Sequence, residues 1–231
     1  YEGSPYPVTI VLATLPKIAT FGLLIRVLQT FAIIQIDVQW LIASIALLSI
    51  ALGNIVAISQ QSLMRLLAYS SIAHMGYLLL AALTFHYFGF AASLFYTLAY
   101  ALSAFIGFGM MIFFNDLYQK NIVNISDLKN LYHTYPFGAW ALLITFFSMA
   151  GIPPFIGFMA KMNIFQALLL PKGYSTLFAT HMPKYFILAI AAILLSVVGA
   201  YYYLRIIRIM FFDCSTEKSA TNKIWKEPNP E

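Results

Sequence analysis

The sequence predicts an all-α membrane protein with about six transmembrane helices, one of which is broken. Hydrophobic residues make up 61% of the 231 residues and charged residues only 9%, whereas soluble domains carry about 45–50% apolar and about 25% charged residues. The apolar residues form long blocks, each near the roughly 20 residues that a helix needs to cross a bilayer. These blocks lack the alternation of barrel strands, and a segment in lipid must satisfy its own backbone, so we expect helices.

The blocks predict one transmembrane domain over residues 1–212. Its helices are expected at residues 8–31, 38–58, 66–85, 91–114, 137–170 and 185–212. Residues 213–231 form a charged tail without an apolar face, which we expect to lie extended along other protein. The chain opens on Tyr1 without a signal-peptide pattern, so we expect part of a longer polypeptide or one product of a split gene. The single cysteine excludes a disulfide framework, and the dispersed basic residues exclude a nucleic-acid patch.

The basic residues also predict an orientation. Eight of them lie on the side where the domain starts and ends: Arg65, Lys120, Lys129, Arg205, Arg208, Lys218, Lys223 and Lys226. Three lie on the opposite side: Arg26, Lys172 and Lys184. By the positive-inside rule, both ends and the polar tail should face the cytoplasm or the mitochondrial matrix. The abundance of Phe, Tyr and Ile favours the mitochondrial inner membrane, with a bacterial plasma membrane as the alternative.

The fifth span contains a predicted break at Gly151–Pro154, within the stretch MAGIPPFIGFMAKM. One straight helix over residues 137–170 would be about 51 Å long, which exceeds a hydrocarbon core of about 30 Å. Pro153 and Pro154 cannot donate to the carbonyls of Met149 and Ala150. Freed carbonyls at this depth must be buried in protein or line a wet cavity. Discontinuous helices of this kind form ion sites in transporters.

Two lysines fall inside the predicted spans. Lys161 follows the break by about two turns, and Lys17 lies about ten residues into the first span, directly after Pro16. A charge at the centre of a span costs about 2.5–3.5 kcal/mol or more, and such residues mark functional sites by default. The alternative is a snorkelling side chain that reaches the interface. We favour function for Lys161, and the central position of Lys17 disfavours snorkelling.

His74 is a third candidate, in the middle of the third span. It shares a helix face with Ser70 and Tyr77. Imidazole titrates near neutrality and could relay protons along a line of hydroxyls, but a lone core histidine can equally be a structural group, and the sequence leaves both open. All eight acidic residues lie outside the spans, so a carboxylate partner for the lysines must come from a missing portion or another subunit.

Four stretches carry a resemblance to a known family: YEGSPYPVTIVLATLPKIATFGLLIR, GNIVAISQQSLMRLLAYSSIAHMGYLLLA, SMAGIPPFIGFMAKMNIF and GAYYYLRIIRIMF. In this order and spacing they resemble subunit N of respiratory complex I, called NADH dehydrogenase subunit 2 in mitochondria. The chain is also similar to the other antiporter-like subunits and to Mrp-type cation/proton antiporters. The resemblance covers residues 1–212 and implies the C-terminal portion, the eighth to thirteenth of fourteen helices. That portion is half of an antiporter-like inverted-repeat fold.

The resemblance also implies roles for the three candidates. Lys17 would be the central-axis lysine, Lys161 the lysine of the broken helix near the outlet, and His74 part of the hydrated line between them. The subunit would translocate protons as part of an NADH:ubiquinone reductase, driven by quinone reduction elsewhere. The alternatives are an Mrp-like cation/proton antiporter and a structural subunit that does not pump.

The same resemblance implies partners and cofactors. The partners would be the other membrane-arm subunits of complex I, including a chain or segment that supplies the preceding helices with their glutamate and lysine, and lipid. No cofactor or metal is expected on this chain, since flavin mononucleotide, iron–sulfur clusters and quinone would belong to other subunits. It would carry no redox chemistry of its own and bind no nucleic acid.

Overall fold

The structure is a computed structural model that describes residues 6–34, 38–118, 124–169 and 177–213. In this part of the chain the regular elements are all helices. They are α1 (Tyr6–Ile34), α2 (Gln39–Ser59), α3 (Leu63–Ala82), α4 (Tyr87–Tyr118), the 3-10 helix η1 (Ile125–Leu128), α5 (Leu131–Thr134), α6 (Pro136–Ala150), α7 (Ile156–Leu169) and α8 (Leu177–Phe211).

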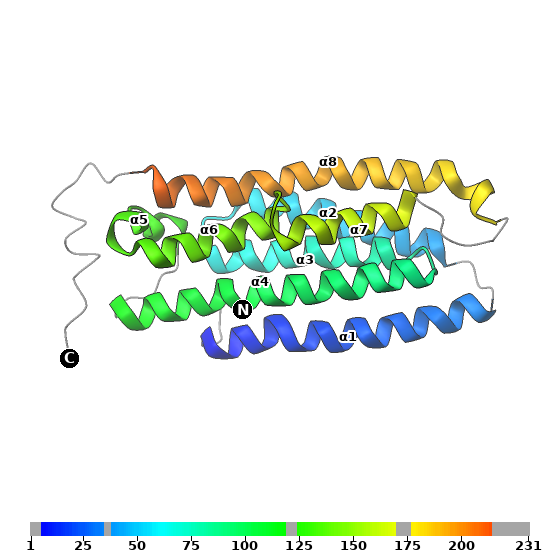
Figure 1. The fold of residues 1–231 in the computed structure, drawn as a ribbon, viewed down its shortest axis with the longest axis horizontal. Coiled ribbons are helices and arrows are strands. Elements are labelled where there is room, and N and C mark those ends of the chain that lie inside the picture. The colour runs from blue at the N-terminus through cyan, green and yellow to red at the C-terminus, as the bar shows by residue number, and fades with distance from the viewer. Residues whose placement is uncertain (1–5, 35–37, 119–123, 170–176, 214–231) are drawn as a thin grey trace.

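The long helices run side by side in an elongated bundle, with α1 along one edge and α8 along the other (Figure 1). The apolar span of α3 is 67% buried, against 33% for those of α1 and α8, so α3 forms the centre. It packs on α2, α4 and α7, whereas α1 packs chiefly on α4. His74 on α3 and Lys161 on α7 therefore lie inside the bundle. Lys17 lies on the edge helix α1, which faces α4.

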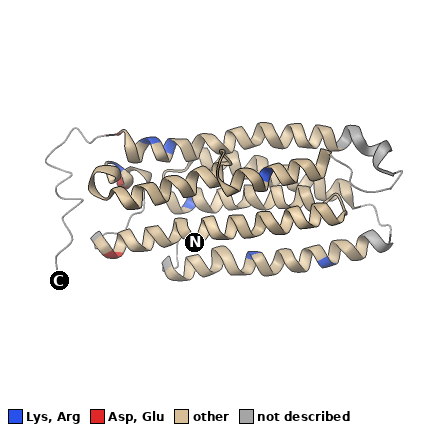
Figure 2. Ribbon diagram, in the orientation of Figure 1, with Lys and Arg blue, Asp and Glu red and all other residues tan. Residues whose placement is uncertain are grey.

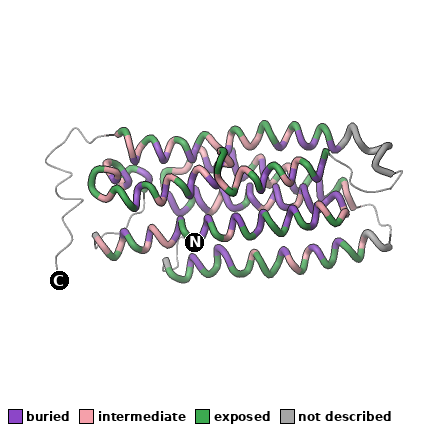
Figure 3. Tube along the Cα trace, in the orientation of Figure 1, coloured by how far each residue is buried: buried purple, intermediate pink, exposed green. Residues whose placement is uncertain are grey.

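The helices have the length and composition of membrane spans. Five of them, α1, α2, α3, α4 and α8, are long and apolar enough to cross a membrane, and α6 and α7 are shorter apolar helices. Buried positions face the middle of the bundle and exposed positions face outward (Figure 3). The outward positions include large apolar side chains such as Leu23 and Leu98, 67% and 61% exposed, and coloured charged positions are sparse along the helices (Figure 2). The prediction of an all-α, multi-pass membrane protein is confirmed.

Several helices begin or end at residues other than the ends of the predicted spans. The third span was predicted at residues 66–85, but α3 begins at Leu63, after the extended Ser62, and ends before Phe85, whose φ is +49°. Helix α4, from Tyr87 to Tyr118, extends beyond the predicted range of 91–114 at both ends. Helix α8 begins at Leu177, before the predicted start at residue 185, and ends at Phe211. Hydropathy marks the stretch that suits the hydrocarbon core, and helices continue beyond it. The tail after Asp213 lies outside the described residues.

The break lies where the prolines predict it. Pro136 occupies the first turn of α6, where a missing N–H costs nothing. The helix ends at Gly151, whose φ of +81° is the left-handed conformation that glycine adopts readily at a helix C-terminus. The N–H groups of Gly151 and Ile152 both donate to the carbonyl of Phe147, at 3.0 and 3.1 Å. Together, α6 and α7 form the predicted discontinuous fifth span.

Candidate functional site

Lys161, on α7, places its amine directly against the helix break. Its Nζ donates to the carbonyl oxygen of Ala150 at 2.7 Å, and the residue is only 7% exposed. This is the carbonyl that Pro154 leaves without its helical donor, because a proline nitrogen carries no hydrogen. The amine also lies 5.4 Å from the centroid of the Tyr77 ring, within cation–π range. The side chain therefore turns toward the centre of the bundle, and the break supplies its acceptor.

Lys17 reaches inward from the edge helix. Its Nζ donates to the hydroxyl of Tyr100 on α4 at 2.9 Å and lies 4.9 Å from the centroid of that ring. Lys17 is half-buried, and both residues lie near the middle of their helices. The amine thus points toward the bundle at mid-span, which is the opposite of snorkelling. The hydroxyls of Thr14 and Thr20 donate to carbonyls of their own helix, those of Ile10 and Pro16.

His74 is buried on α3, where it is 5% exposed. Its Nδ1 is 2.7 Å from the hydroxyl of Tyr96 on α4, and its Nε2 is 3.1 Å from the hydroxyl of Tyr203 on α8. The imidazole centroid is 5.0 Å from that of Tyr100, the partner of Lys17. Both ring nitrogens therefore have hydroxyl partners, which can act as donors or acceptors.

The predicted line of hydroxyls along α3 is only partly right. Ser70 and Tyr77 are buried with His74, as one helix face requires. However, the Ser70 hydroxyl donates to the carbonyl of Leu67 at 2.8 Å, and that of Tyr77 donates to the carbonyl of Ala192 at 3.2 Å. The hydrogen-bond partners of His74 come from neighbouring helices, because groups on one helix face also find acceptors in the backbone around them.

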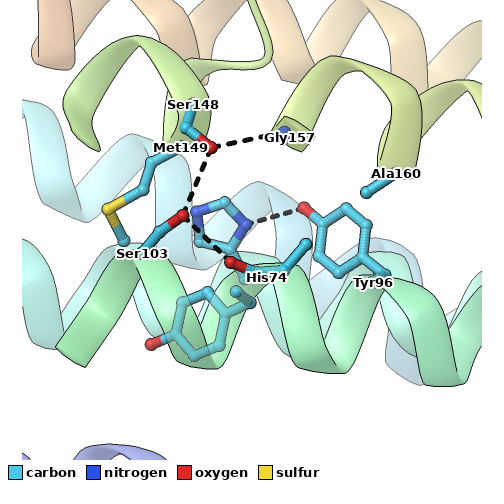
Figure 4. Close-up of a pocket in the computed structure, with 9 residues that line it drawn as sticks. His74, Tyr96, Ser103, Ser148, Met149, Gly157 and Ala160 are labelled. Carbon is cyan, nitrogen blue, oxygen red and sulfur yellow. Dashed lines mark hydrogen bonds between the residues drawn. The ribbon is translucent and has the colours of Figure 1, made fainter. Parts of the chain in front are cut away.

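Two small cavities border His74, each of about 10 Å³. The first, shown in Figure 4, is lined by His74, Tyr96, Ala99, Tyr100, Ser103, Ser148, Met149, Gly157 and Ala160. The second is lined by Asn54, Ala73, His74, Tyr77, Met149, Lys161, Gly199, Tyr202 and Tyr203. Each is near the roughly 10–15 Å³ that one water molecule needs. Tyr100 opens on the first cavity and Lys161 on the second, so His74 connects the surroundings of the two lysines.

A serine pair ties the two halves of the broken helix to α4. The Ser148 hydroxyl, on α6, is 3.2 Å from that of Ser103 and accepts the N–H of Gly157, on α7, at 3.3 Å (Figure 4). A Cβ added to Gly157 would lie 1.7 Å from the Ser148 carbonyl oxygen, so only glycine fits there. The first turn of α7 is thus fixed against the last turns of α6, which sets the direction in which Lys161 leaves its helix.

A hydrogen-bonded pair, Asn54 and Tyr202, lines the cavity beside Lys161. Tyr202 donates from its hydroxyl to Oδ1 of Asn54 at 3.2 Å, and Nδ2 of Asn54 donates to the carbonyl of Leu195 at 2.9 Å. The rings of Tyr202 and Tyr203 lie 4.5 Å apart. These contacts join α2 to α8 around the site and keep its polar atoms satisfied.

Sequence reasoning found the three ionisable residues but missed the tyrosines that surround them, Tyr96, Tyr100, Tyr202 and Tyr203. Aromatic residues are abundant throughout this chain, 16% of its residues, so a single tyrosine in an apolar stretch carries no signal. The pattern that could have found two of them is a polar tip every four residues on one face, as at Tyr96 and Tyr100.

The acidic residues that the structure describes lie outside the predicted spans. They are Asp116, Asp127 and Asp213, which lie near the end of α4, in η1 and after α8. Within these described ranges no group of His, Cys, Asp and Glu side chains could hold a metal ion. Lys161 has a carbonyl and a ring face as neighbours, so a carboxylate for it would have to come from elsewhere.

Comparison with known proteins gives the family. Residues 1–186 match the family described as NADH:quinone oxidoreductase/Mrp antiporter, TM. The chain is 41% identical over 215 residues to NADH-quinone oxidoreductase subunit N of Nitrosomonas europaea, covering 92% of this chain and 42% of that protein. The predicted resemblance to subunit N is confirmed. The chain spans less than half the length of the relatives it matches.

Solved structures agree on the fold. A chain of respiratory complex I from Thermus thermophilus with bound aureothin superposes with a TM-score of 0.73 at 31% identity, over 93% of this chain and 44% of that one. A chain of the Mrp complex from Dietzia sp. superposes with a TM-score of 0.65 at 24% identity, over 78% of this chain and 31% of that one. The second likeness is one of fold alone.

Proposed function

We propose, because the chain belongs to the family of membrane subunits shared by NADH:quinone oxidoreductases and Mrp antiporters, that it is part of a proton-translocating membrane-arm subunit of a complex I. The observation that carries this proposal is the hydrogen bond of Lys161 to the Ala150 carbonyl at the helix break. A buried amine held by a carbonyl without a helical donor is a site that can exist with or without an extra proton.

Protons would move through the site by a series of short steps. Lys17 and Tyr100 share a hydrogen bond of 2.9 Å. One water in the first cavity, which Tyr96 and Tyr100 both line, would link Tyr100 to Tyr96, the partner of His74 Nδ1. His74 and Tyr203 share a contact of 3.1 Å, and one water in the second cavity would reach Lys161. Each tyrosine hydroxyl can accept a proton on one side and donate one on the other. Hydroxyls, imidazole and water thus alternate between the two amines.

Electrostatic repulsion would give the steps their direction. Both lysines lie close to His74: the partner of Lys17, Tyr100, packs its ring on the imidazole, and Lys161 lines the same cavity as His74. In a medium of low effective dielectric, a second positive charge nearby is costly. A proton that arrives at one position therefore favours its departure from the next. A change of charge in a neighbouring subunit, caused by quinone reduction there, would start the sequence.

The rest of the complex would supply what the site needs. We place flavin, iron–sulfur clusters and quinone on other subunits, so that this chain takes part in NADH:quinone reductase activity without carrying redox chemistry. A buried carboxylate for the lysines would come from a preceding segment or a partner subunit. The named relatives are bacterial, which favours a bacterial plasma membrane over the mitochondrial inner membrane that composition suggested.

The test compares the two lysines in the assembled complex. We expect Lys161→Ala to lower proton translocation coupled to quinone reduction by about 10²-fold, the lower range for loss of a proton-transfer group, and Lys17→Ala to lower it as well. The measurement is proton uptake by proteoliposomes beside the rate of quinone reduction. Arg208→Ala is the matched control, since that cation is exposed and paired with Asp213 at 4.0 Å. Wild-type pumping in both lysine variants would reject the proposal.

An Mrp-like antiporter is the second candidate, because the matching family includes both kinds of protein. The two candidates differ in their partners. Purification of the native complex would separate them: flavin and iron–sulfur absorbance in the purified material supports the first, and small membrane partners alone support the second. A structural subunit without pumping predicts normal pumping in both lysine variants.

A further inference from the structure

A third cavity, polar and larger than the two beside His74, lies at the end of the bundle, away from the lysine site. It has a volume of about 210 Å³, more than ten times the roughly 10–15 Å³ needed by one water. Its walls are Gln61, Asn124, Ile125, Ser126, Lys129, Arg205 and Ile209. They come from the turn between α2 and α3, from the connector around η1 and from the last turns of α8, which meet at one end of the bundle (Figure 1).

Hydrogen bonds fix these walls against one another. The N–H of Ile125 donates to the carbonyl of Gln61 at 2.9 Å, which ties the connector to the α2–α3 turn. Arg205 donates from Nη1 to the carbonyl of Ile58, at the end of α2, at 3.1 Å. Asp127 accepts the N–H of Asn124 at 2.9 Å and so closes η1 on itself. The cavity is therefore a built feature of three connected elements.

Its charge suits an anion. The cations Lys129 and Arg205 both line it, together with the neutral polar side chains of Gln61, Asn124 and Ser126. The nearby Asp127 does not line the cavity and is engaged with Asn124. The bond to Ile58 uses one of the five N–H donors of the arginine, and a guanidinium fork binds phosphate oxygens with two donors at once.

The surroundings favour a phospholipid over a free phosphate. Along α8, Val197, Tyr201, Arg205 and Ile209 follow one another at four-residue spacing, on one face. Val197 and Tyr201 are 65% and 58% exposed. An outward-facing apolar strip therefore runs along α8 from the cavity toward the middle of the helix. Arg205 lies about 9 Å along α8 from its end at Phe211, so the two cations sit near the end of the bundle. The volume is below the roughly 300–1,000 Å³ of sites for whole small molecules.

We propose that this cavity binds the phosphate of an anionic phospholipid, with Arg205 and Lys129 on the phosphate and an acyl chain along Val197 and Tyr201. The proposal does not depend on proton translocation. The predicted orientation places this end on the cytoplasmic side, and basic pockets between transmembrane helices on that side bind anionic head groups. Bound lipid would hold the α2–α3 turn, the connector and α8 together.

The experiment uses the assembled complex in nanodiscs of phosphatidylcholine. A trace of phosphatidylglycerol carrying a diazirine in its acyl chain is activated by light, and mass spectrometry locates the adducts. We expect labelling on the Val197–Ile209 strip that unlabelled phosphatidylglycerol removes by competition and that phosphatidylcholine and millimolar inorganic phosphate leave in place. Lys129→Gln should weaken the apparent affinity about fivefold, the effect of one interfacial charge, and Arg205→Lys should weaken it while it keeps the charge.

Arg208→Gln is the matched control. Arg208 is an exposed cation on the same helix, and it does not line the cavity. Labelling of this variant should equal that of the wild type. Equal labelling in all variants, or equal labelling by a phosphatidylcholine probe, would mean ordinary surrounding lipid and overturn the proposal. Full competition by inorganic phosphate would overturn it in favour of a soluble anion. None of these readouts depends on pumping, so this proposal and the proposed function fail separately.

Discussion

The two intramembrane lysines both lie in apolar stretches close to prolines, but their surroundings in the structure differ. Lys161 is buried on α7, and its amine bonds a backbone carbonyl that the helix break leaves free. Lys17 is half-buried on the edge helix α1, and its amine bonds the side-chain hydroxyl of Tyr100. One amine is held by the backbone of a fixed break, and the other by a rotatable side chain on a neighbouring helix.

This difference indicates where the site is rigid and where it can adjust. The acceptor of Lys161 moves only if the break moves, and the break is fixed by Ser148 and Gly157. The acceptor of Lys17 can turn about its side-chain bonds while the helices stay in place. We therefore expect changes at the break to affect both stability and pumping, and changes near Lys17 to affect pumping alone.

The largest effect is expected from Gly157→Ala. Its added methyl group would overlap the Ser148 carbonyl, and α7 would have to move away from α6. Overpacking of this kind costs about 1–3 kcal/mol, occasionally more. The yield and thermal stability of the purified complex should fall. Gly109→Ala on α4 is the matched control, since no atom lies within 4 Å of its added Cβ. Equal losses in both variants would contradict a fixed break.

A smaller effect is expected from Ser148→Ala. The change removes the acceptor of the Gly157 N–H, and leaving a buried N–H unpaired costs about 1–3 kcal/mol. The Ser103 hydroxyl also loses its contact with Ser148 but keeps its bond to the Ala99 carbonyl at 2.9 Å. We expect a lower unfolding temperature and slower pumping by a complex that still assembles. Ser71→Ala is the control, because the buried Ser71 hydroxyl donates only within its own helix, to the Ala68 carbonyl. A Ser71 variant as impaired as the Ser148 variant would mean that the hydroxyl across the break has no special role.

The smallest effect is expected from Tyr100→Phe. It removes the hydroxyl that accepts from Lys17 and leaves the aromatic ring beside His74. Because Lys17 is only half-buried, its amine can find other partners, so we expect normal assembly and pumping lowered by less than about tenfold, compared with the larger loss from removing an ionisable group. Tyr87→Phe, at an 84% exposed position, should pump as the wild type does. Unchanged pumping in Tyr100→Phe would remove Tyr100 from the path.

Much of the fold could be predicted because the bilayer constrains it so strongly. Apolar blocks near 20 residues permit few alternatives to spanning helices, and the prolines at 153 and 154 locate the break to within a few residues. Helix ends were predicted less well. The first turns of α8 at Leu177 and the last turns of α4 toward Tyr118 lie where polar residues are tolerated, and hydropathy gives no boundary there.

The site was predictable only where a residue is unusual for its surroundings. Lys17, Lys161 and His74 stand out because ionisable groups are rare inside spans. Tyr96 and Tyr203 contact His74 from α4 and α8, and such contacts depend on how helices pack, which the sequence pattern of one helix does not contain. The pairing of Lys161 with Ala150 lies between these cases, since the prolines identify the free carbonyl but not the side chain that takes it.

The most direct measurement is the number of protons translocated per electron by complex I carrying His74→Gln. Glutamine can still hydrogen-bond the hydroxyls of Tyr96 and Tyr203 but does not titrate, so it separates proton transfer from structural support. In proteoliposomes oxidising NADH, we predict fewer protons per electron than in the wild type, with all subunits and the unfolding temperature retained. A wild-type ratio at a wild-type rate of quinone reduction would contradict a path through His74.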